Sequence, residues 1–196
     1  NDNICYTEYT NGSINRSNNR GLSWSSISGG LSGTFAFVTP FIVCRSNPSV
    51  LYNAGSSIFK STIGGGSWSN LGSLGYNALS MDASATSTDT VYVGVIPVAA
   101  NQPAIIYRST NGTSFTNISG VQLPSRYPTD LHVNPNNSAD VYVTMGGFGS
   151  GHVYRSTNAG VTWNNISGNL PDVPHQSIVI DPMFPQNVYV GNDLGV

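Results

Sequence analysis

The stretch Val153-Tyr-Arg-Ser-Thr-Asn-Ala-Gly-Val-Thr-Trp163 decides the fold, because the chain carries versions of it four times. Each copy starts with a hydrophobic residue, places a cation and then a serine shortly after it, and closes on an aromatic ring. The copies occupy residues 14–24, 58–68, 106–115 and 153–163. Their closing aromatic residues lie 44, 47 and 48 positions apart, so the chain is an array of repeats with a nearly constant period.

A period of this length, filled with short strands, is typical of the blades of a β-propeller. In the last complete repeat, strand-like runs cover residues 131–133, 141–144, 152–155 and 161–166. They alternate apolar and polar residues, are rich in Val, Tyr, Ile and Thr, and are separated by Gly, Asn, Pro and Ser. The sequence therefore predicts an all-β chain, with residues 1–196 forming a single propeller array of four-stranded antiparallel blades, about four of them visible.

The count of strands does not fit a closed ring of four blades. First strands are expected to begin near Phe41, Ala78, Asp130 and Ser177, and the chain both opens and closes on a second strand. This gives three strands, three full blades of four strands and two strands more, one strand too many for a four-bladed ring. Three interpretations stay open: part of a longer propeller, a ring with overlapping ends, or an arc that other copies complete because open edges are unfavourable.

The composition points to an extracellular or cell-surface protein. Charged residues make up 8% of the chain, with Lys60 and Glu8 as the sole lysine and glutamate, so Ser, Asn, Thr and Gly must supply the polar surface. A net charge of −2 without a run of Lys or Arg argues against a nucleic-acid partner. We expect no membrane span and no cofactor. The expected partners are other copies of the chain or the rest of a longer chain, and a glycan.

Two copies of the repeat carry a resemblance to a known superfamily. Ser17-Asn-Asn-Arg-Gly-Leu-Ser-Trp24 and Ser156-Thr-Asn-Ala-Gly-Val-Thr-Trp163 resemble the Asp-box, Ser-x-Asp-x-Gly-x-Thr-Trp, of the BNR-repeat propellers. That superfamily includes sialidases, sortilin-type receptors, xyloglucanase-type glycoside hydrolases and photosystem II assembly propellers. The resemblance implies the propeller fold, but it says little about function, because one fold hosts many activities.

No copy keeps the aspartate of the Asp-box. Its place is taken by Asn19, Ile63, Asn111 and Asn158. Asparagine can cap the turn through its side-chain oxygen, whereas at Ile63 we expect the glycines of residues 64–66 to form the turn by backbone freedom alone. We interpret the boxes and their aromatic residues as structural. The residues concerned are Ser17, Asn19, Gly21, Trp24, Ser61, Trp68, Ser109, Asn111, Phe115, Ser156, Asn158, Gly160 and Trp163.

The cations of the repeat form a second structural row. Arg16, Lys60, Arg108 and Arg155 hold equivalent places in successive copies, so they lie on different blades rather than in one cluster. We expect them to donate hydrogen bonds to neighbouring strands.

Binding residues are expected on one face of the propeller. The long, irregular connections cover residues 29–40, 94–104, 120–130, 145–151 and 168–176, and all of them emerge on the same side. Loops elaborated on a rigid scaffold are where binding usually resides. The binding candidates are Arg126, Tyr127, Phe148, His152 and His175, and the same loops also offer Phe35, Phe37, Tyr76, Asp130 and Asp172.

Catalysis is not the preferred interpretation. Glycoside hydrolysis needs two carboxyl groups across a cleft, and the acidic residues are few. Asp181 recurs as Asp82 and Asn134, which indicates a turn former at a repeat position. Asp193 resembles the acidic residue that follows a second strand in xyloglucanase-like propellers, where one such residue is catalytic. We therefore favour a non-catalytic scaffold, adhesion or self-assembly module, with a carbohydrate-active propeller as the alternative.

The remaining motifs leave alternatives open. Cys5 and Cys44 are either two buried apolar side chains or one disulfide. The three histidines are scattered and predict no metal site. Sequons for N-glycosylation occur at Asn11, Asn15, Asn111, Asn117, Asn136 and Asn165.

Overall fold

The computed structural model describes residues 3–96 and 101–196, and in this part of the chain there are strands and no helix. The predicted loop 94–104 thus lies partly outside the described residues. Nor does the described part contain a helix long and apolar enough to cross a membrane.

The strands form five antiparallel sheets, which we call blades 1 to 5. Blade 1 contains β1 (Cys5–Glu8), β2 (Ile14–Ser17) and β3 (Ser25–Ser26). Blade 2 contains β4 (Phe41–Val43), β5 (Leu51–Ala54), β6 (Ser57–Ser61) and β7 (Ser69–Ser73). Blade 3 contains β8 (Ala78–Ala83), β9 (Val91–Val95), β10 (Ile105–Ser109) and β11 (Thr116–Asn117). Blade 4 contains β12 (Pro128–Val133), β13 (Val141–Met145), β14 (Val153–Ser156) and β15 (Asn164–Asn165). Blade 5 contains β16 (His175–Ile180) and β17 (Val188–Asn192).

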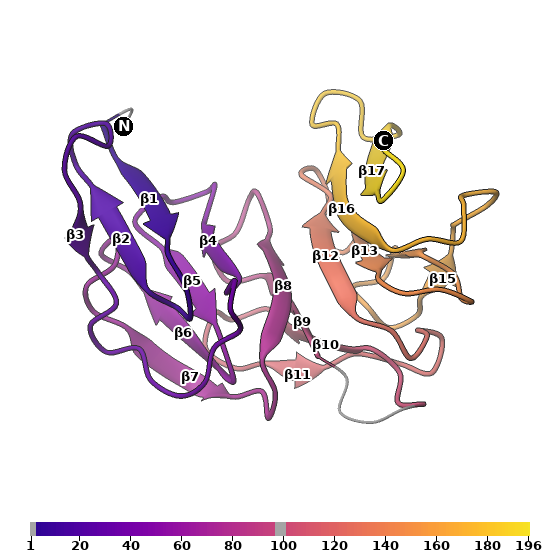
Figure 1. Ribbon diagram of the computed structural model, residues 1–196, viewed down its shortest axis with the longest axis horizontal. Helices are drawn as coiled ribbons and strands as arrows, with labels where there is room; N and C mark the ends of the chain where they lie inside the picture. Colours follow the sequence, from indigo (N-terminus) through magenta and orange to yellow (C-terminus); the bar gives the residue numbers. More distant parts are fainter. Residues whose placement is uncertain (1–2, 97–100) are drawn as a thin grey trace.

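This pattern of three, four, four, four and two strands confirms the fold and the strand count predicted from the sequence. The blades follow one another around an open arc, with the two ends of the chain on opposite sides of the opening (Figure 1). The first strands β4, β8, β12 and β16 lie on the inner side of this arc. Within the described residues β1 pairs only with β2 and β17 only with β16, so the interpretation of a ring with overlapping ends is not what the chain adopts.

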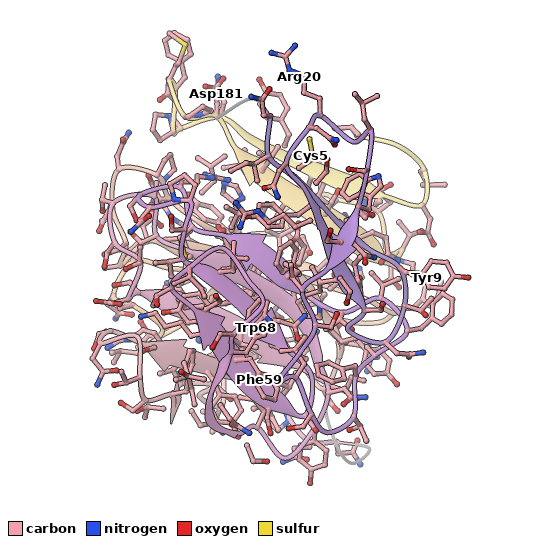
Figure 2. The ribbon with its side chains drawn as sticks, turned by 90° about the vertical axis from the view of Figure 1, so that its left-hand side faces the viewer. Cys5, Tyr9, Arg20, Phe59, Trp68 and Asp181 are labelled. Carbon is pink, nitrogen blue, oxygen red and sulfur yellow. The ribbon has the colours of Figure 1, made fainter. Side chains whose placement is uncertain are left out.

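Burial follows from the position of each strand between blades. The second strands β5, β9 and β13 are buried at every position, because a neighbouring blade covers each of their two faces. The equivalent strands β1 and β17, in the incomplete blades, are partly exposed. Figure 2 looks onto the side of blade 1, where Trp68 and Phe59 lie among the sheets and Arg20 projects outward.

Serine and asparagine side chains build the turn between third and fourth strands. In blade 4, Ser156 Oγ accepts hydrogen bonds from the backbone N–H groups of Asn158 and Gly160, at 3.3 and 2.8 Å. Asn158 Oδ1 accepts the N–H of Thr162 at 2.9 Å. Blades 1 and 3 repeat this arrangement with Asn19 and Asn111.

The turn of blade 2 keeps only half of this arrangement. Ser61 Oγ accepts the N–H groups of Ile63 and Gly65 at 3.4 and 3.0 Å, so a side chain still helps to hold the turn. The expectation that glycine freedom alone carries it is therefore too simple. Gly64 and Gly65 have φ angles of +78° and +95°, a left-handed backbone that glycine adopts at little cost.

The cations link each blade to the next. The donors Arg16 Nη1, Lys60 Nζ and Arg108 Nη1 reach carbonyl oxygens in the turn of the following blade. These oxygens belong to Gly64 at 3.3 Å, Gly112 at 3.4 Å and Ala159 at 2.7 Å. The described residues of blade 5 form only two strands and no such turn, and Arg155 instead binds Asp140 of its own blade at 2.8 and 3.0 Å.

The two cysteines are free thiols. Cys44 is buried in the hydrophobic cluster between blades 2 and 3. On β1, Tyr6 faces blade 2, with its ring centroid 5.8 Å from that of Phe41, so the adjacent Cys5 side chain points to the opposite face. The disulfide alternative is thus not adopted, because Cys5 points away from blade 2 whereas Cys44 is buried between blades 2 and 3.

Candidate binding site

Loops at the junction of blades 4 and 5 bring the predicted binding residues together. Arg126 and Tyr127 precede β12, Phe148 and His152 lie between β13 and β14, and His175 begins β16. The N–H of Gly146 donates to the Tyr127 carbonyl at 2.9 Å, which fastens the first two of these loops to each other.

Two buried histidines form the centre of this junction. The rings of His152 and His175 are stacked, with centroids 4.8 Å apart and an angle of 16° between their planes. His152 Nε2 lies 3.0 Å from Asp172 Oδ1, and since a carboxylate only accepts, this nitrogen carries the proton. His175 Nδ1 likewise donates to the Val173 carbonyl at 2.7 Å.

These contacts make the histidines part of the scaffold. Both rings are buried, and His152 Nδ1 has no hydrogen-bond partner within the described residues. Asp172 Oδ1 also accepts the N–H of Gly149 at 2.7 Å, so it ties the β13–β14 loop to the loop before β16. A ligand approaching from solvent would meet the loops rather than the two imidazole rings.

The loops at this junction also carry an arginine and two exposed aromatic rings. Arg126 Nε donates to the Phe148 carbonyl at 3.0 Å, and Arg126 Nη1 donates to the Ser125 carbonyl at 2.8 Å, so much of the guanidinium is occupied. Tyr127 and Phe148 are both more than half exposed. We call these two rings the aromatic patch.

Acidic residues on the inner strands join blades instead of forming a catalytic pair. Asp82 accepts the N–H groups of Ala83 and, in the next blade, Val133, at 2.9 and 2.8 Å. Asp130 does the same with Leu131 and Ile178, both at 2.9 Å. Burial raises the pKa of both carboxyl groups, and the backbone hydrogen bonds oppose this shift.

This bridging corrects the sequence alignment of Asp82 with Asp181. Asp181 Oδ1 accepts the N–H of Met183 at 2.8 Å and Asn134 Oδ1 that of Asn136 at 2.9 Å, so these two residues are turn formers. In blade 3 the turn former is Ser84, whose Oγ accepts the Thr86 N–H at 3.2 Å. Asp82 lies two residues earlier, where its side chain can reach the next blade.

Asp193 is exposed in the turn closed by the bridge between Asn192 and Gly195. No hydrogen bond or ion pair joins it to another side chain in the described part of the chain. No group of three or more His, Cys, Asp or Glu side chains suited to a metal ion occurs in residues 3–96 and 101–196.

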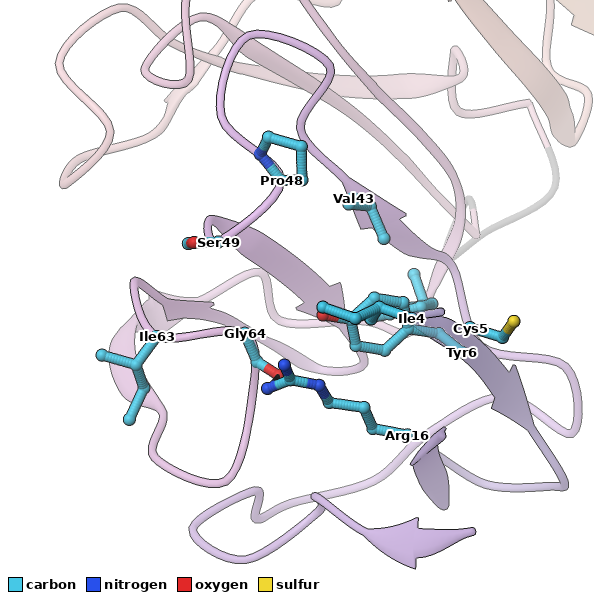
Figure 3. Close-up of a pocket in the computed structure, with 10 residues that line it drawn as sticks. Ile4, Cys5, Tyr6, Arg16, Val43, Pro48, Ser49, Ile63 and Gly64 are labelled. Carbon is cyan, nitrogen blue, oxygen red and sulfur yellow. Dashed lines mark hydrogen bonds between the residues drawn. The ribbon is translucent and has the colours of Figure 1, made fainter. Parts of the chain in front are cut away.

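Two cavities lie at the ends of the arc, and the sequence interpretation missed both. The head cavity, about 670 Å³, lies between blades 1 and 2 and is lined by Tyr6, Arg16, Phe41 and Val43 among others (Figure 3). The tail cavity, about 440 Å³, lies between blades 4 and 5. Its apolar lining includes Val153, Ile166, Leu170, Val188, Val190 and Val196. The strand count signalled these places, because an incomplete blade leaves its neighbour uncovered.

Comparison with solved structures places this geometry in a known fold. An ancestral GH74 enzyme superposes with a TM-score of 0.77 and 20% identity, over 97% of this chain and 26% of that chain. A chain of the nidogen/laminin complex superposes with a TM-score of 0.68 and 14% identity, over 97% of this chain and 68% of that chain. YCF48 from Cyanidioschyzon merolae superposes with a TM-score of 0.66 and 15% identity, over 96% of this chain and 60% of that chain.

The fold is that of a β-propeller. The propeller arc spans only about a quarter of the GH74 enzyme that it matches. No protein-family model and no curated protein matches the sequence. Because identities this low show the fold alone, the three structures assign no activity to this propeller.

Proposed function

We propose that this chain is a non-catalytic, extracellular β-propeller scaffold that acts by adhesion or by assembling with further blades. The observation that carries the proposal is the state of its two ends: among the described residues β1 and β17 each have one unpaired edge, and each borders an apolar cavity. Unpaired edges and uncovered apolar faces favour association with another sheet.

The surface supports an extracellular setting. Charged residues are only 8% of the chain. Of the asparagines in the sequons, Asn11, Asn111, Asn117, Asn136 and Asn165 are exposed and Asn15 is half-buried. These positions suit glycosylation in an organism that performs it.

The native mass tests this proposal. Light scattering combined with negative-stain imaging should reveal rings or filaments well above the 20.7 kDa of one chain. A monodisperse particle of that single mass at every concentration, with no binding to extracellular matrix or cell surfaces, would contradict it.

A second candidate function is that of a carbohydrate-active propeller. It is favoured by the similarity to a GH74 enzyme along 97% of this chain and by the aromatic patch, since exposed rings offer flat apolar faces to a sugar. Screening on β-glucans tests it. Hydrolysis that Asp193→Ala abolishes would support an enzyme, whereas binding that Tyr127→Ala and Phe148→Ala abolish would support a lectin. If the chain neither hydrolyses nor binds any of the glycans tested, this candidate function is excluded.

A further inference from the structure

Tryptophan residues close the junctions between blades inside this chain. Trp68 of blade 2 packs against Ile14 and Ile27 of blade 1 and is 9% exposed. Its Nε1 donates to the Ile27 carbonyl at 2.7 Å. Trp163 of blade 4 is 3% exposed and donates to the Ile118 carbonyl of blade 3 at 3.4 Å. Each such tryptophan thus enters a hole left by the blade before it.

The tail cavity is equivalent to the site that Trp68 fills between blades 1 and 2, but no tryptophan fills it. Ile166 and Val153 hold the places of Ile27 and Ile14, because in both pairs the isoleucine N–H donates to the carbonyl of its partner at 2.9 Å. Val188 holds the place of Leu51, since each lies opposite the last residue of a first strand. Ile166 is 43% exposed. Among the described residues no donor reaches its carbonyl oxygen.

Trp24 is equivalent to Trp68 and Trp163, but it has no preceding blade to pack against in the described residues. It closes the Asp-box-like turn of blade 1, which matches the turns of blades 3 and 4, but within the described residues no blade covers it from the other side. It is 44% exposed, and its Nε1 has no acceptor within the described part of the chain. The arc therefore presents a free wedge at its head and a matching free hole at its tail.

We infer that Trp24 of a second copy of this chain enters the tail cavity and donates through Nε1 to the Ile166 carbonyl, which joins the copies head to tail. This inference rests on the proposed assembly function and names the surfaces that carry it. The occupant is a second copy because the chain itself shows, at Trp68 and Trp163, which side chain this hole accepts. A contact between two different surfaces repeats from copy to copy, so it produces a closed ring or a filament.

The joined blade has to accommodate one strand too many, because β1 and β17 are both second strands. In blade 2, Ser61 of the third strand lies opposite Leu51, and in blade 1 Ser17 lies opposite Cys5. When β17 of one copy takes the place of β1 of the next, Ser17 lies opposite Val188 and the blade has four strands. The displaced β1 is a short strand that is nowhere fully buried.

Sedimentation and light scattering of variants test the inference. Trp24→Ala and Ile166→Asp should each weaken the association of copies at least tenfold, while melting temperatures measured in dilute solution stay near that of the parent. Tyr9→Ala removes another exposed aromatic ring from blade 1 and serves as the control that leaves association unchanged.

The outcomes separate this inference from the proposed function. If Trp24→Ala and Ile166→Asp associate as strongly as the parent chain, the head-to-tail contact is overturned and assembly remains the proposed function. A parent chain that stays a monomer at every concentration would overturn the head-to-tail contact, and one that also binds no extracellular matrix or cell surface would overturn the proposed function as well.

Discussion

Residue 63 is the one box position where the chain lacks a side-chain cap. Asn19, Asn111 and Asn158 each accept a backbone N–H in the turn that follows, and Ile63 cannot. The backbone of this turn already has the left-handed geometry found in blades 1 and 4, and Ile63 is exposed. We therefore predict that Ile63→Asn adds one hydrogen bond and raises the free energy of unfolding by about 1 kcal/mol. Urea unfolding measures it, with Ile63→Ala as the matched control. Equal midpoints for the two variants would contradict the prediction.

The thiol of Cys44 should be inert in the folded chain. It is buried, and burial raises its pKa from 9.0 to about 11, so the reactive thiolate is scarce at pH 8. Cys5 is only half-buried. A chromogenic disulfide reagent should react with one thiol per native chain, that of Cys5, and with two in guanidinium. Cys5→Ser should abolish the reaction of the native chain. A chain with no reactive thiol in guanidinium would indicate that the cysteines are oxidised.

The bridging carboxylates predict a dependence of stability on pH. Because burial raises the pKa of Asp82 in the folded state, the folded chain holds this proton more tightly than the unfolded chain does. The contribution of Asp82 to stability is complete below the ordinary pKa of about 4 and is lost as the pH rises through the raised value. Between these values, wild type should lose stability relative to Asp82→Asn, measured by urea unfolding from pH 4 to 7. If wild type instead becomes more stable relative to Asp82→Asn as the pH rises across this interval, the raised pKa of Asp82 is refuted.

At the scale of elements, tryptophan wedges should matter only where a blade precedes them. Trp68→Ala empties a packed junction and should cost about 3–5 kcal/mol. Trp24→Ala removes a half-exposed ring of the same kind and should cost less than about 1 kcal/mol in the monomer. Thermal unfolding in dilute solution compares the two. Similar losses would mean that Trp24 already has a packing partner within one chain.

The strands and loops also show what the sequence could and could not predict. Repetition located the blades, but first strands expected at Asp130 and Ser177 begin at Pro128 and His175. In each case a register shift separates the expected start from the observed one, and a bulge leaves no mark on the alternation of residues. The candidate binding residues were chosen by their loop positions, and the structure brings these loops together at the junction of blades 4 and 5. Their spacing could not show that His152 and His175 are buried, since that depends on how three loops pack together.

At the scale of the whole molecule, the arc carries a second strand at each end, and this redundancy is open to experiment. If β17 of one copy replaces β1 of the next, β1 competes with assembly, so removing residues 1–7 should strengthen it. The truncation keeps Glu8, whose carboxylate accepts the N–H groups of Gly12 and Thr39 and so holds the start of blade 2.

Sedimentation should show the truncated chain assembling at a concentration at least several-fold lower than the full chain. Trp24→Ala in the truncated chain is the control, and it should cancel the gain because the wedge is still required. Circular dichroism should confirm that the blades stay folded. A truncated chain that is folded yet assembles less well would show that β1 belongs to the contact between copies rather than competing with it.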